Sequence, residues 1–305
     1  MPLDTREATS SSTALLPVEA PYRLDLTATV LRRTSANAVD AFDAGGAYRR
    51  ALATGSGTVA VTVRQVAPDA LEVVVVGRPG ARAEALRAVE RMLATGTGPG
   101  AFASRARRIP WLAPLARRMR GVRPPRYPTL WEACANAIVF QQVSLHAAGA
   151  IMRRFVRAYG ERVETDGGEL YAFPAPGAAL AASDADLRAA GLSVAKVAAL
   201  RNVVRALSDG TLDESVVERS PSSEAAEYLC RVKGIGPWSA ALILLRGMGR
   251  LDVFPAGDSG VARGLSLFGP GAAATPAVLD ALGNERGMLY FHVLLARLEA
   301  RGELP

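Results

Sequence analysis

The residues of this sequence that could do chemistry lie together between positions 229 and 260. A glycine turn, Gly234-Ile235-Gly236, separates two apolar stretches with helical spacing, and Pro237 follows where a helix accepts proline in its first turn. Both glycines suit positive φ, and the free N–H groups that begin the second helix form an anion site for a nucleic-acid phosphate. An ordinary corner between two helices fits the glycines equally well. The residues expected beside the phosphate are Lys233, Gly234, Gly236 and Ser239.

A loop rich in glycine and proline follows the second helix and carries Asp258. A carboxylate near a sugar carbon can stabilise developing positive charge and hold or deprotonate an attacking water. On the residues alone, an N-cap for the next helix is the favoured interpretation, because Asp is a preferred cap. Trp238, at the start of the second helix, offers a ring face to a cationic base or an apolar surface for packing between helices.

The turn and the acid together resemble the helix-hairpin-helix/Gly-Pro-Asp superfamily of DNA glycosylases, specifically its 3-methyladenine DNA glycosylase II type. The sequence departs from the family's pattern at Gly257, where another Asp often precedes the catalytic acid. The resemblance implies that Asp258 is the catalytic residue and that Trp238 binds the substrate base. The motifs that carry it, in the family's order and spacing, are Gly234-Ile235-Gly236-Pro237-Trp238-Ser239-Ala240, Asp252-Val253-Phe254 and Asp258.

The activity that this resemblance implies is monofunctional excision of alkylated bases, such as 3-methyladenine and 7-methylguanine, in base excision repair. The base is flipped out of double-stranded damaged DNA, and its N-glycosidic bond is then hydrolysed. Bifunctional relatives place a Schiff-base lysine where this sequence has Trp238, so we expect no strand cleavage. Two alternatives remain open: a protein that binds damaged DNA without chemistry, and a glycosylase of oxidised or deaminated bases.

A second substrate contact implied by the resemblance lies in the segment 140–144. Family members have a Gln-x-Val-Ser turn that faces the lesion, and x fills the gap left by the extruded base. Here the turn begins at Gln141, and Gln142 stands at x, where the best-known relatives carry Leu. On sequence alone the pair is simply a polar helix end. Leu242 and Glu285 stand where relatives often have Tyr and Trp, which leaves the breadth of substrate choice open.

No cofactor is expected, apart from a monovalent cation, Na⁺ or K⁺, that the hairpin of relatives holds through backbone carbonyls. By resemblance these carbonyls belong to Cys230, Val232 and Ile235. The two cysteines, Cys134 and Cys230, are too few for an iron–sulfur cluster or a disulfide framework. No His/Cys/Asp cluster predicts a zinc site, and no nucleotide-binding motif occurs.

The elements that must position these residues are mostly helices. Upstream, an alternating pattern predicts a strand at 22–26, and a short helix is predicted at 36–44. The final helix carries His292, which fits a hydrogen-bonded core residue better than a catalyst. The other predicted elements are a hairpin of strands at 58–65 and 70–76, an amphipathic helix at 81–94, and helices beginning at 130 and covering 145–159, 184–190, 194–207, 224–232 and 259–268.

The predicted fold class is mainly α with an N-terminal α+β domain: a small antiparallel sheet precedes a helix-hairpin-helix glycosylase fold. Residues 1–20, rich in Ser, Thr and Ala, are predicted to be a disordered leader. The α+β domain is assigned to 21–98 and the helical glycosylase domain to 99–305.

Composition agrees with a polyanionic partner. The chain of 305 residues has a formal net charge of +7, and its pI is about 9.9. An arginine-rich run at 105–123 is most often a solvated face, with DNA contact as the alternative. No apolar run has membrane-spanning length and no signal peptide is recognisable, so we expect a cytoplasmic, nucleoid-associated bacterial protein that acts as a monomer on double-stranded damaged DNA.

Overall fold

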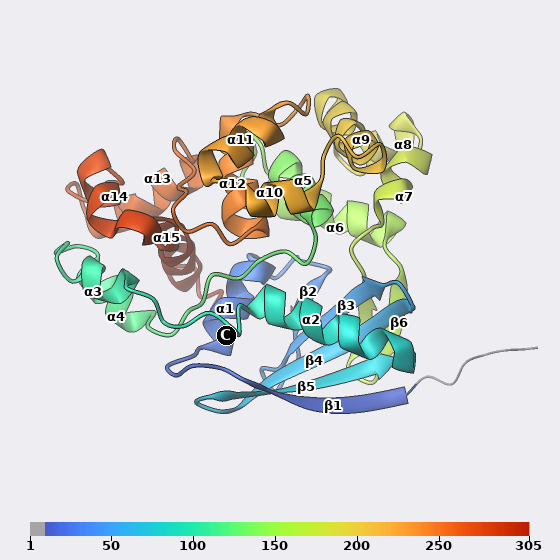
Figure 1. The fold of residues 1–305 in the computed structure, drawn as a ribbon, viewed down its shortest axis with the longest axis horizontal. Helices are drawn as coiled ribbons and strands as arrows, with labels where there is room; N and C mark the ends of the chain where they lie inside the picture. The colour runs from blue at the N-terminus through green and yellow to red at the C-terminus, as the bar shows by residue number, and fades with distance from the viewer. Residues whose placement is uncertain (1–9, 305) are drawn as a thin grey trace, which may run out of the picture.

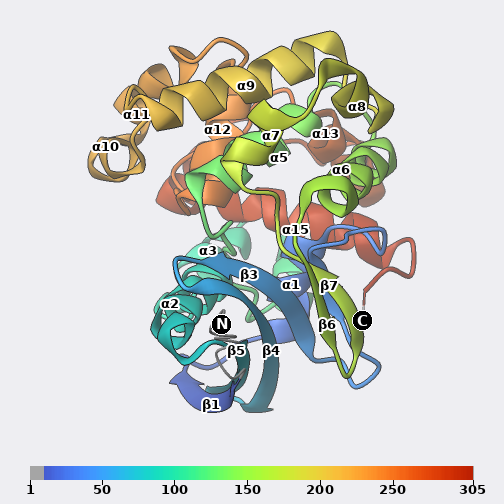
Figure 2. The same cartoon turned by 90° about the vertical axis from the view of Figure 1, so that its right-hand side faces the viewer.

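Five antiparallel strands form a sheet that lies on one side of the helices in the computed structural model, which describes residues 10–304 (Figure 1). The order of the strands across the sheet is β1-β5-β4-β3-β2. Helix α2 (Arg82–Leu93) packs on one face of the sheet (Figure 2). The strands are β1 (Ser10–Pro17), β2 (Asp40–Phe42), β3 (Tyr48–Thr54), β4 (Gly57–Ala67) and β5 (Ala70–Gly77).

Buried and exposed side chains alternate along the strands, and the buried ones form the core of the sheet. Val61 of β4 pairs with Val75 of β5, and both are buried, as is Val73. Val66 and Val76 lie on the other face and are exposed. Because successive side chains in a strand point to opposite faces, the buried set forms one surface that contacts α2 residues such as Val89 and Met92.

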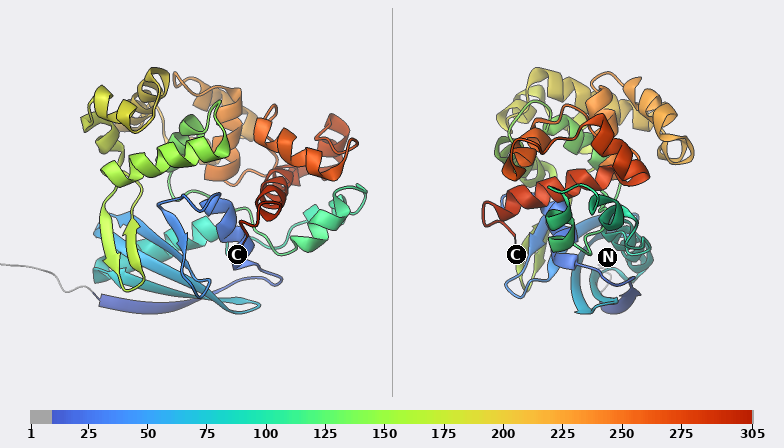
Figure 3. Two further views of the ribbon diagram at one scale, coloured as in Figure 1. Left: turned by 180° about the vertical axis from the view of Figure 1, so that it is seen from behind. Right: turned by 90° about the vertical axis from the view of Figure 1, so that its left-hand side faces the viewer.

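The helices divide into two lobes, each with its own apolar core. The hairpin lobe runs from α5 to α12. The C-terminal lobe contains α3, α4 and α13–α15, and α1 packs against α15 within it (Figure 3, left).

The elements of the hairpin lobe are α5 (Leu130–Val139), α6 (Leu145–Tyr159), β6 (Arg162–Thr165), β7 (Gly168–Tyr171), α7 (Pro176–Ala181), α8 (Asp184–Ala189), α9 (Val194–Ser208), α10 (Glu214–Arg219), α11 (Ser222–Cys230) and α12 (Pro237–Gly247). Those of the C-terminal lobe are α1 (Leu24–Arg32), α3 (Phe102–Ala106), α4 (Ala113–Arg118), α13 (Ser259–Leu265), α14 (Pro276–Leu282) and α15 (Gly287–Glu299). Short 3₁₀ turns at Pro79–Ala81, Ser266–Phe268 and Gly283–Glu285 precede or follow helices.

A buried charge cluster joins the sheet to the hairpin lobe. Arg50 of β3 is 1% exposed and donates hydrogen bonds to Asp40 Oδ1 at 2.7 Å and to Glu132 Oε1 of α5 at 2.7 Å. The Tyr48 hydroxyl also donates to Asp40, at 2.6 Å. Breaking a buried pair of this kind leaves an uncompensated charge, so the cluster holds α5 firmly against the sheet.

Three expectations from the sequence are wrong. Residues 10–17 of the expected leader form β1, because their alternating side chains pair with β5 at the sheet edge; residues 1–9 lie outside the described part. The segment 22–26 enters helix α1, since Leu24, Thr27 and Leu31 continue with helical spacing beyond the short window that suggested a strand. Segment 36–44 contains no helix: its residues Asp40–Phe42 pair with β3 as β2, so tertiary pairing overrides local preference.

The other predicted elements are confirmed. The β4–β5 hairpin turns at Pro68-Asp69, and helices α2, α6, α8 and α9 have the expected bounds within one or two residues. The β6–β7 hairpin was not predicted from the sequence. None of the helices within residues 10–304 is long and apolar enough to cross a membrane.

Candidate active site

The glycine hairpin joins α11 to α12, and its two glycines differ. Gly234 has φ +109°, and a Cβ there would lie 2.4 Å from the Cβ of Ala199 in α9. Gly236 has φ −99°, which any residue can adopt, so the expectation of positive φ is correct for Gly234 only. A Cβ added to Gly236 would meet nothing within 4 Å. The space in front of the α12 N-terminus is therefore open.

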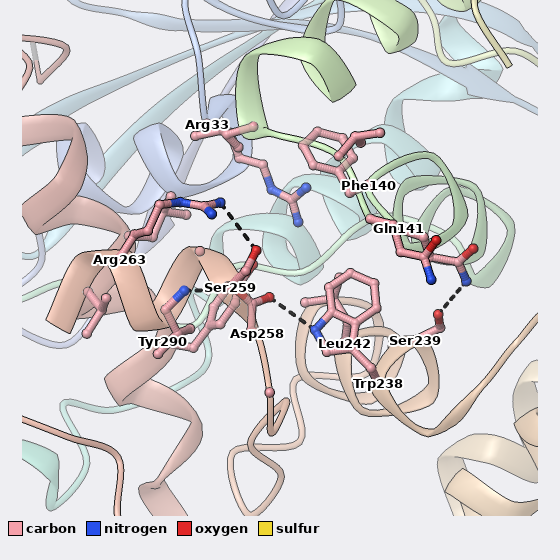
Figure 4. A pocket seen from close by; sticks show the side chains of 18 of the residues that line it. Arg33, Phe140, Gln141, Trp238, Ser239, Leu242, Asp258, Ser259, Arg263 and Tyr290 are labelled. Carbon is pink, nitrogen blue, oxygen red and sulfur yellow. Dashed lines mark hydrogen bonds between the residues drawn. The ribbon is translucent and has the colours of Figure 1, made fainter. Parts of the chain in front are cut away.

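Gln141, just after α5, is tied to the hairpin. Its Nε2 donates to the carbonyl of Gly234 at 3.0 Å and to Ser239 Oγ at 2.7 Å (Figure 4). Ser239 is only 2% exposed, so its hydroxyl orients Gln141 and does not face an incoming phosphate as expected. Gln142 is exposed and has φ +53°, a left-handed conformation that is uncommon outside glycine.

Asp258 makes two contacts with its two carboxylate oxygens. Oδ1 accepts a hydrogen bond from the backbone N–H of Val261 at 2.8 Å, so Asp258 is the N-cap of α13. Oδ2 accepts one from Nε1 of Trp238 at 3.1 Å, across the gap between the lobes (Figure 4). The cap interpretation and the active-site interpretation are thus compatible, because each uses a different oxygen.

These residues line a cavity of about 530 Å³ between the two lobes, within the range of ligand sites. The hairpin lobe contributes Phe140, Gln141, Gln142, Trp238, Ser239 and Leu242. The other side contributes Asp258, Arg263, Tyr290 and Arg297 from the C-terminal lobe, and Arg33 from the end of α1. Lys233, Cys230, Val232 and Ile235 do not line it.

Sequence reasoning did not select Arg33, Tyr290 and Arg297. Tyr290 and Arg297 line the cavity together with Val293 and Leu294, at spacings of three, four and seven residues along α15. That helical face, bounded by two polar side chains, was a signal that could have been used. Arg33 carries no comparable signal, since only the packing of α1 on α15 brings it to the cavity.

The cavity is rich in positive charge. Among the described residues that line it, Asp258 is the only acid, against Arg33, Arg263 and Arg297. Burial raises the pKa of Tyr290, so its hydroxyl is a protonated donor at neutral pH. Burial also lowers the pKa of Arg297, with Arg301 and Arg263 nearby acting in the same direction.

His292 lies in the core behind the cavity and is 2% exposed. Its Nδ1 is 2.8 Å from the carbonyl oxygen of Met288, and its ring packs on Phe102 at a centroid distance of 4.3 Å. Burial lowers its pKa to about 4, so the ring is neutral at physiological pH. The interpretation of His292 as a core residue is confirmed.

The two lysines, Lys196 and Lys233, differ in exposure, and two arginines of the run at 105–123 make contacts within the protein. Lys233 is exposed on the hairpin turn, whereas the Nζ of Lys196 donates to the carbonyl of Val139 at 2.7 Å. Within the run at 105–123, Arg118 pairs with Glu299 and Arg123 is 1% exposed. At least these two arginines stabilise the protein itself.

Comparison with known proteins finds DNA repair glycosylases among the similar sequences and structures. Residues 135–283 match a family model whose description is 'HhH-GPD superfamily base excision DNA repair protein'. The DNA-3-methyladenine glycosylase of Bacillus subtilis is 27% identical over 167 residues, which are 55% of each chain. The probable bifunctional transcriptional activator/DNA repair enzyme AlkA of Mycobacterium tuberculosis is 31% identical over 254 residues, covering 81% of this chain and 49% of that protein.

A solved structure, the 3-methyladenine DNA glycosylase from Archaeoglobus fulgidus, has a TM-score of 0.78 at 25% identity, over 94% of this chain and 99% of that one. The chain spans about half the length of the curated relatives that it matches. The fold class predicted from the sequence, mainly α with an N-terminal antiparallel sheet, is confirmed. The segment 135–283, which contains the glycine hairpin and Asp258, is similar in sequence to the HhH-GPD superfamily of base excision DNA repair proteins, and the chain shares the fold of a solved 3-methyladenine DNA glycosylase.

Proposed function

We propose that this protein is a monofunctional DNA glycosylase that excises alkylated bases from double-stranded DNA. The observation that carries the proposal is the position of Asp258. This residue lines the cavity of about 530 Å³, and its carboxylate accepts a hydrogen bond from the indole of Trp238 in the first turn of α12. A carboxylate held by two N–H donors stays where charge develops, without reorganising during the reaction.

In this mechanism the base leaves the DNA stack and enters the cavity between Trp238 and Tyr290. Loss of the base leaves positive charge on the sugar, and the carboxylate of Asp258 stabilises that charge. The same carboxylate orients or deprotonates the water that attacks the sugar. Alkylation makes the base a better leaving group, and the aromatic rings favour a cationic base through cation–π contact.

The hairpin binds the phosphates of the DNA backbone. The N–H groups at the start of α12 have no partner within that helix, and the glycine at 236 leaves the approach open. Lys233 adds an exposed positive charge beside them. Such contacts bind phosphate without reading sequence, so affinity falls as salt rises.

In this proposal Gln142 fills the gap that the flipped base leaves in the duplex. Its side chain is exposed at the mouth of the cavity, and its left-handed backbone is held by the turn between α5 and α6. Strain of this kind persists where surrounding structure enforces it, often at functional sites. An amide can also hydrogen-bond the base that has lost its partner.

A monovalent cation fits the hairpin turn. The carbonyl of Val232 accepts the N–H of Ile235 at 3.0 Å, whereas the carbonyls of Cys230 and Ile235 accept no hydrogen bond among residues 10–304. Such oxygens suit a hard cation. When bound, the ion would add positive charge near the phosphate contact.

One gel assay tests the proposal. Duplexes that each contain 3-methyladenine, 7-methylguanine, hypoxanthine or 8-oxoguanine are incubated with the protein and then treated with or without alkali. We expect strands that break only after alkali, and no covalent complex with borohydride, because no lysine is among the described residues that line the cavity. Release confined to 8-oxoguanine, or a trapped complex, would contradict the proposal.

A further inference from the structure

Arg33 sits in an unusual turn at the end of α1. Its φ is +59° and its ψ is −47°, and the N–H of Thr34 donates to the carbonyl of Arg32 at 2.6 Å. This three-residue turn with positive φ is the rare, strained form, and a bulky residue at its centre is an outlier. The conformation turns the Arg33 side chain away from the direction that α1 would have given it. Its guanidinium points into the cavity (Figure 4).

The guanidinium of Arg33 is buried, and two of its three nitrogens are enclosed without a hydrogen-bond partner among residues 10–304. The residue is 4% exposed, and its charged carbon lies 4.2 Å from the centre of the Phe140 ring. The enclosed Nε and Nη2 atoms have no hydrogen-bond partner, and no ion pair to Arg33 occurs within residues 10–304. Buried donors are almost always satisfied, because an unmade hydrogen bond is costly. Nη1 is not enclosed in this way, so it is the guanidinium nitrogen through which Arg33 can donate to an acceptor on a ligand in the cavity.

A second buried cation strengthens the need for an acceptor. Arg246 is 1% exposed and donates to the carbonyl of Val30 at 2.8 Å, and its Nε and Nη1 have no hydrogen-bond partner in the described part of the chain. Its pKa is lowered by burial and by the charge of Arg33. The ring of Tyr127 lies near both guanidinium groups, at 6.0 Å from Arg33 and 5.1 Å from Arg246. Two neighbouring cations faced mainly by aromatic rings favour an electron-rich oxygen nearby.

We propose that Arg33 determines which bases are excised, by selecting those that present a carbonyl oxygen over those that present an amino group at the same position. This inference rests on the proposed function, and it adds a specificity residue from outside the hairpin and its acid. At purine C6, guanine and hypoxanthine carry an acceptor oxygen, whereas adenine carries an amino donor. A guanidinium can donate to the first group and only repels the second.

The test uses two lesions that share a charge. DNA treated with a methylating agent contains 7-methylguanine and 3-methyladenine; both rings are cationic, but only the first has a C6 carbonyl. The initial rates of release of the two bases are measured by chromatography in one tube. In Arg33→Met, the ratio of 7-methylguanine to 3-methyladenine should fall about tenfold or more, the effect of losing a charge-assisted hydrogen bond.

A hypoxanthine duplex extends the test to a neutral base that carries the same carbonyl. We expect its excision by Arg33→Met to fall at least as much as that of 7-methylguanine. Arg32→Met is the matched control, because Arg32 is the neighbouring residue but lies outside this cavity and donates to the carbonyl of Glu303. Its release ratio should equal that of the wild type.

Loss of folded protein lowers both rates together, so the ratio remains informative. If Arg33→Met does not fold, Arg33→Gln is tested instead. The amide keeps hydrogen-bond donors but removes the charge and the paired donors of the guanidinium, so the ratio of 7-methylguanine to 3-methyladenine should fall by a smaller factor. An unchanged ratio in a folded variant would overturn the role of Arg33 and leave it as a packing residue. Failure of the wild type to release either methylated base would instead defeat the proposed function.

Discussion

The two sides of the cavity are built by different means. On the hairpin side, the contributing residues come from two short segments, and backbone conformation holds them: positive φ at Gly234 and Gln142, and hydrogen bonds from Gln141. On the C-terminal side, Arg33 and Tyr290 come from distant parts of the chain: a positive-φ turn directs Arg33, and burial against apolar and aromatic groups holds both side chains. In the proposed function, the hairpin side makes contacts common to all DNA, and Arg33 on the C-terminal side discriminates between bases.

The largest expected effect comes from Asp258, because this residue of the C-terminal lobe accepts a hydrogen bond from Trp238 of the hairpin lobe. In Asp258→Asn, the amide oxygen can still cap α13, but the amide nitrogen then faces the indole N–H. We expect single-turnover excision to fall ~10²–10³-fold, or about 3–4 kcal/mol, with the loss of the charge. DNA affinity, measured on the same variant, should stay near the wild-type value.

The control for this experiment is Asp252→Asn, since Asp252 is an exposed acid of the same loop. It should excise at the wild-type rate. Near-wild-type excision by Asp258→Asn would mean that the residue only caps α13, and the division of roles between the two sides would fail.

The burial of His292 in the C-terminal lobe predicts that the free energy of unfolding decreases at acidic pH. His292 has a folded-state pKa of about 4, below its usual 6.5, so the unfolded chain binds more protons between these values. The corresponding stability is fully present above pH 6.5 and is lost as the pH falls towards 4, by about 3 kcal/mol. The free energy of unfolding, measured by urea titration at several pH values, should fall more steeply for the wild type than for His292→Gln. Parallel curves would show that burial of His292 has no such effect.

The two hairpin glycines form a matched pair. Gly234→Ala places a methyl group against Ala199 at positive φ, so it should cost roughly 1–3 kcal/mol of unfolding free energy. Gly236→Asp meets no neighbour, so its melting temperature should be unchanged while its DNA affinity falls through repulsion of phosphate. Equal melting temperatures, or unaltered DNA binding by Gly236→Asp, would mean that the glycines do not have separate roles.

The smallest expected effect concerns Gln142. Removing the amide in Gln142→Ala should slow excision from duplexes about tenfold, since flipping a paired base costs a few kcal/mol and the side chain offsets part of that cost. Excision from single strands, where there is no gap to fill, should change little. Equal losses on both substrates would assign Gln142 a structural role only.

The hairpin side was predictable because its signals are local. Glycine at 234, proline at 237 and the apolar spacing of α12 all act within a few residues, and they predicted the turn correctly. The N-cap role of Asp258 was also predictable from local signals, whereas its catalytic assignment came from the family resemblance of the turn and the acid together. The expectation for Ser239 did not foresee that its hydroxyl would be covered by Gln141, because that contact joins two helices distant in sequence.

The other side was less predictable because it depends on packing between distant segments. The position of Arg33 follows from α1 lying on α15, and the segment around α1 was expected to be a strand. The β1 strand was also missed, since its small polar residues resemble a flexible tail until their pairing with β5 is known. Short windows cannot reveal such partners.

The buried cluster around Arg50 has a mechanical consequence. A side chain that fills a gap in a duplex experiences an equal and opposite force from the stacked bases. That force on Gln142 would pass along α5, a rod of about 15 Å for ten residues, to Glu132. There the salt bridge to Arg50 transfers it to β3, whose strand is bonded on both edges. If Gln142 fills the gap as proposed, the sheet would be the rigid support against which the helical part pushes into DNA.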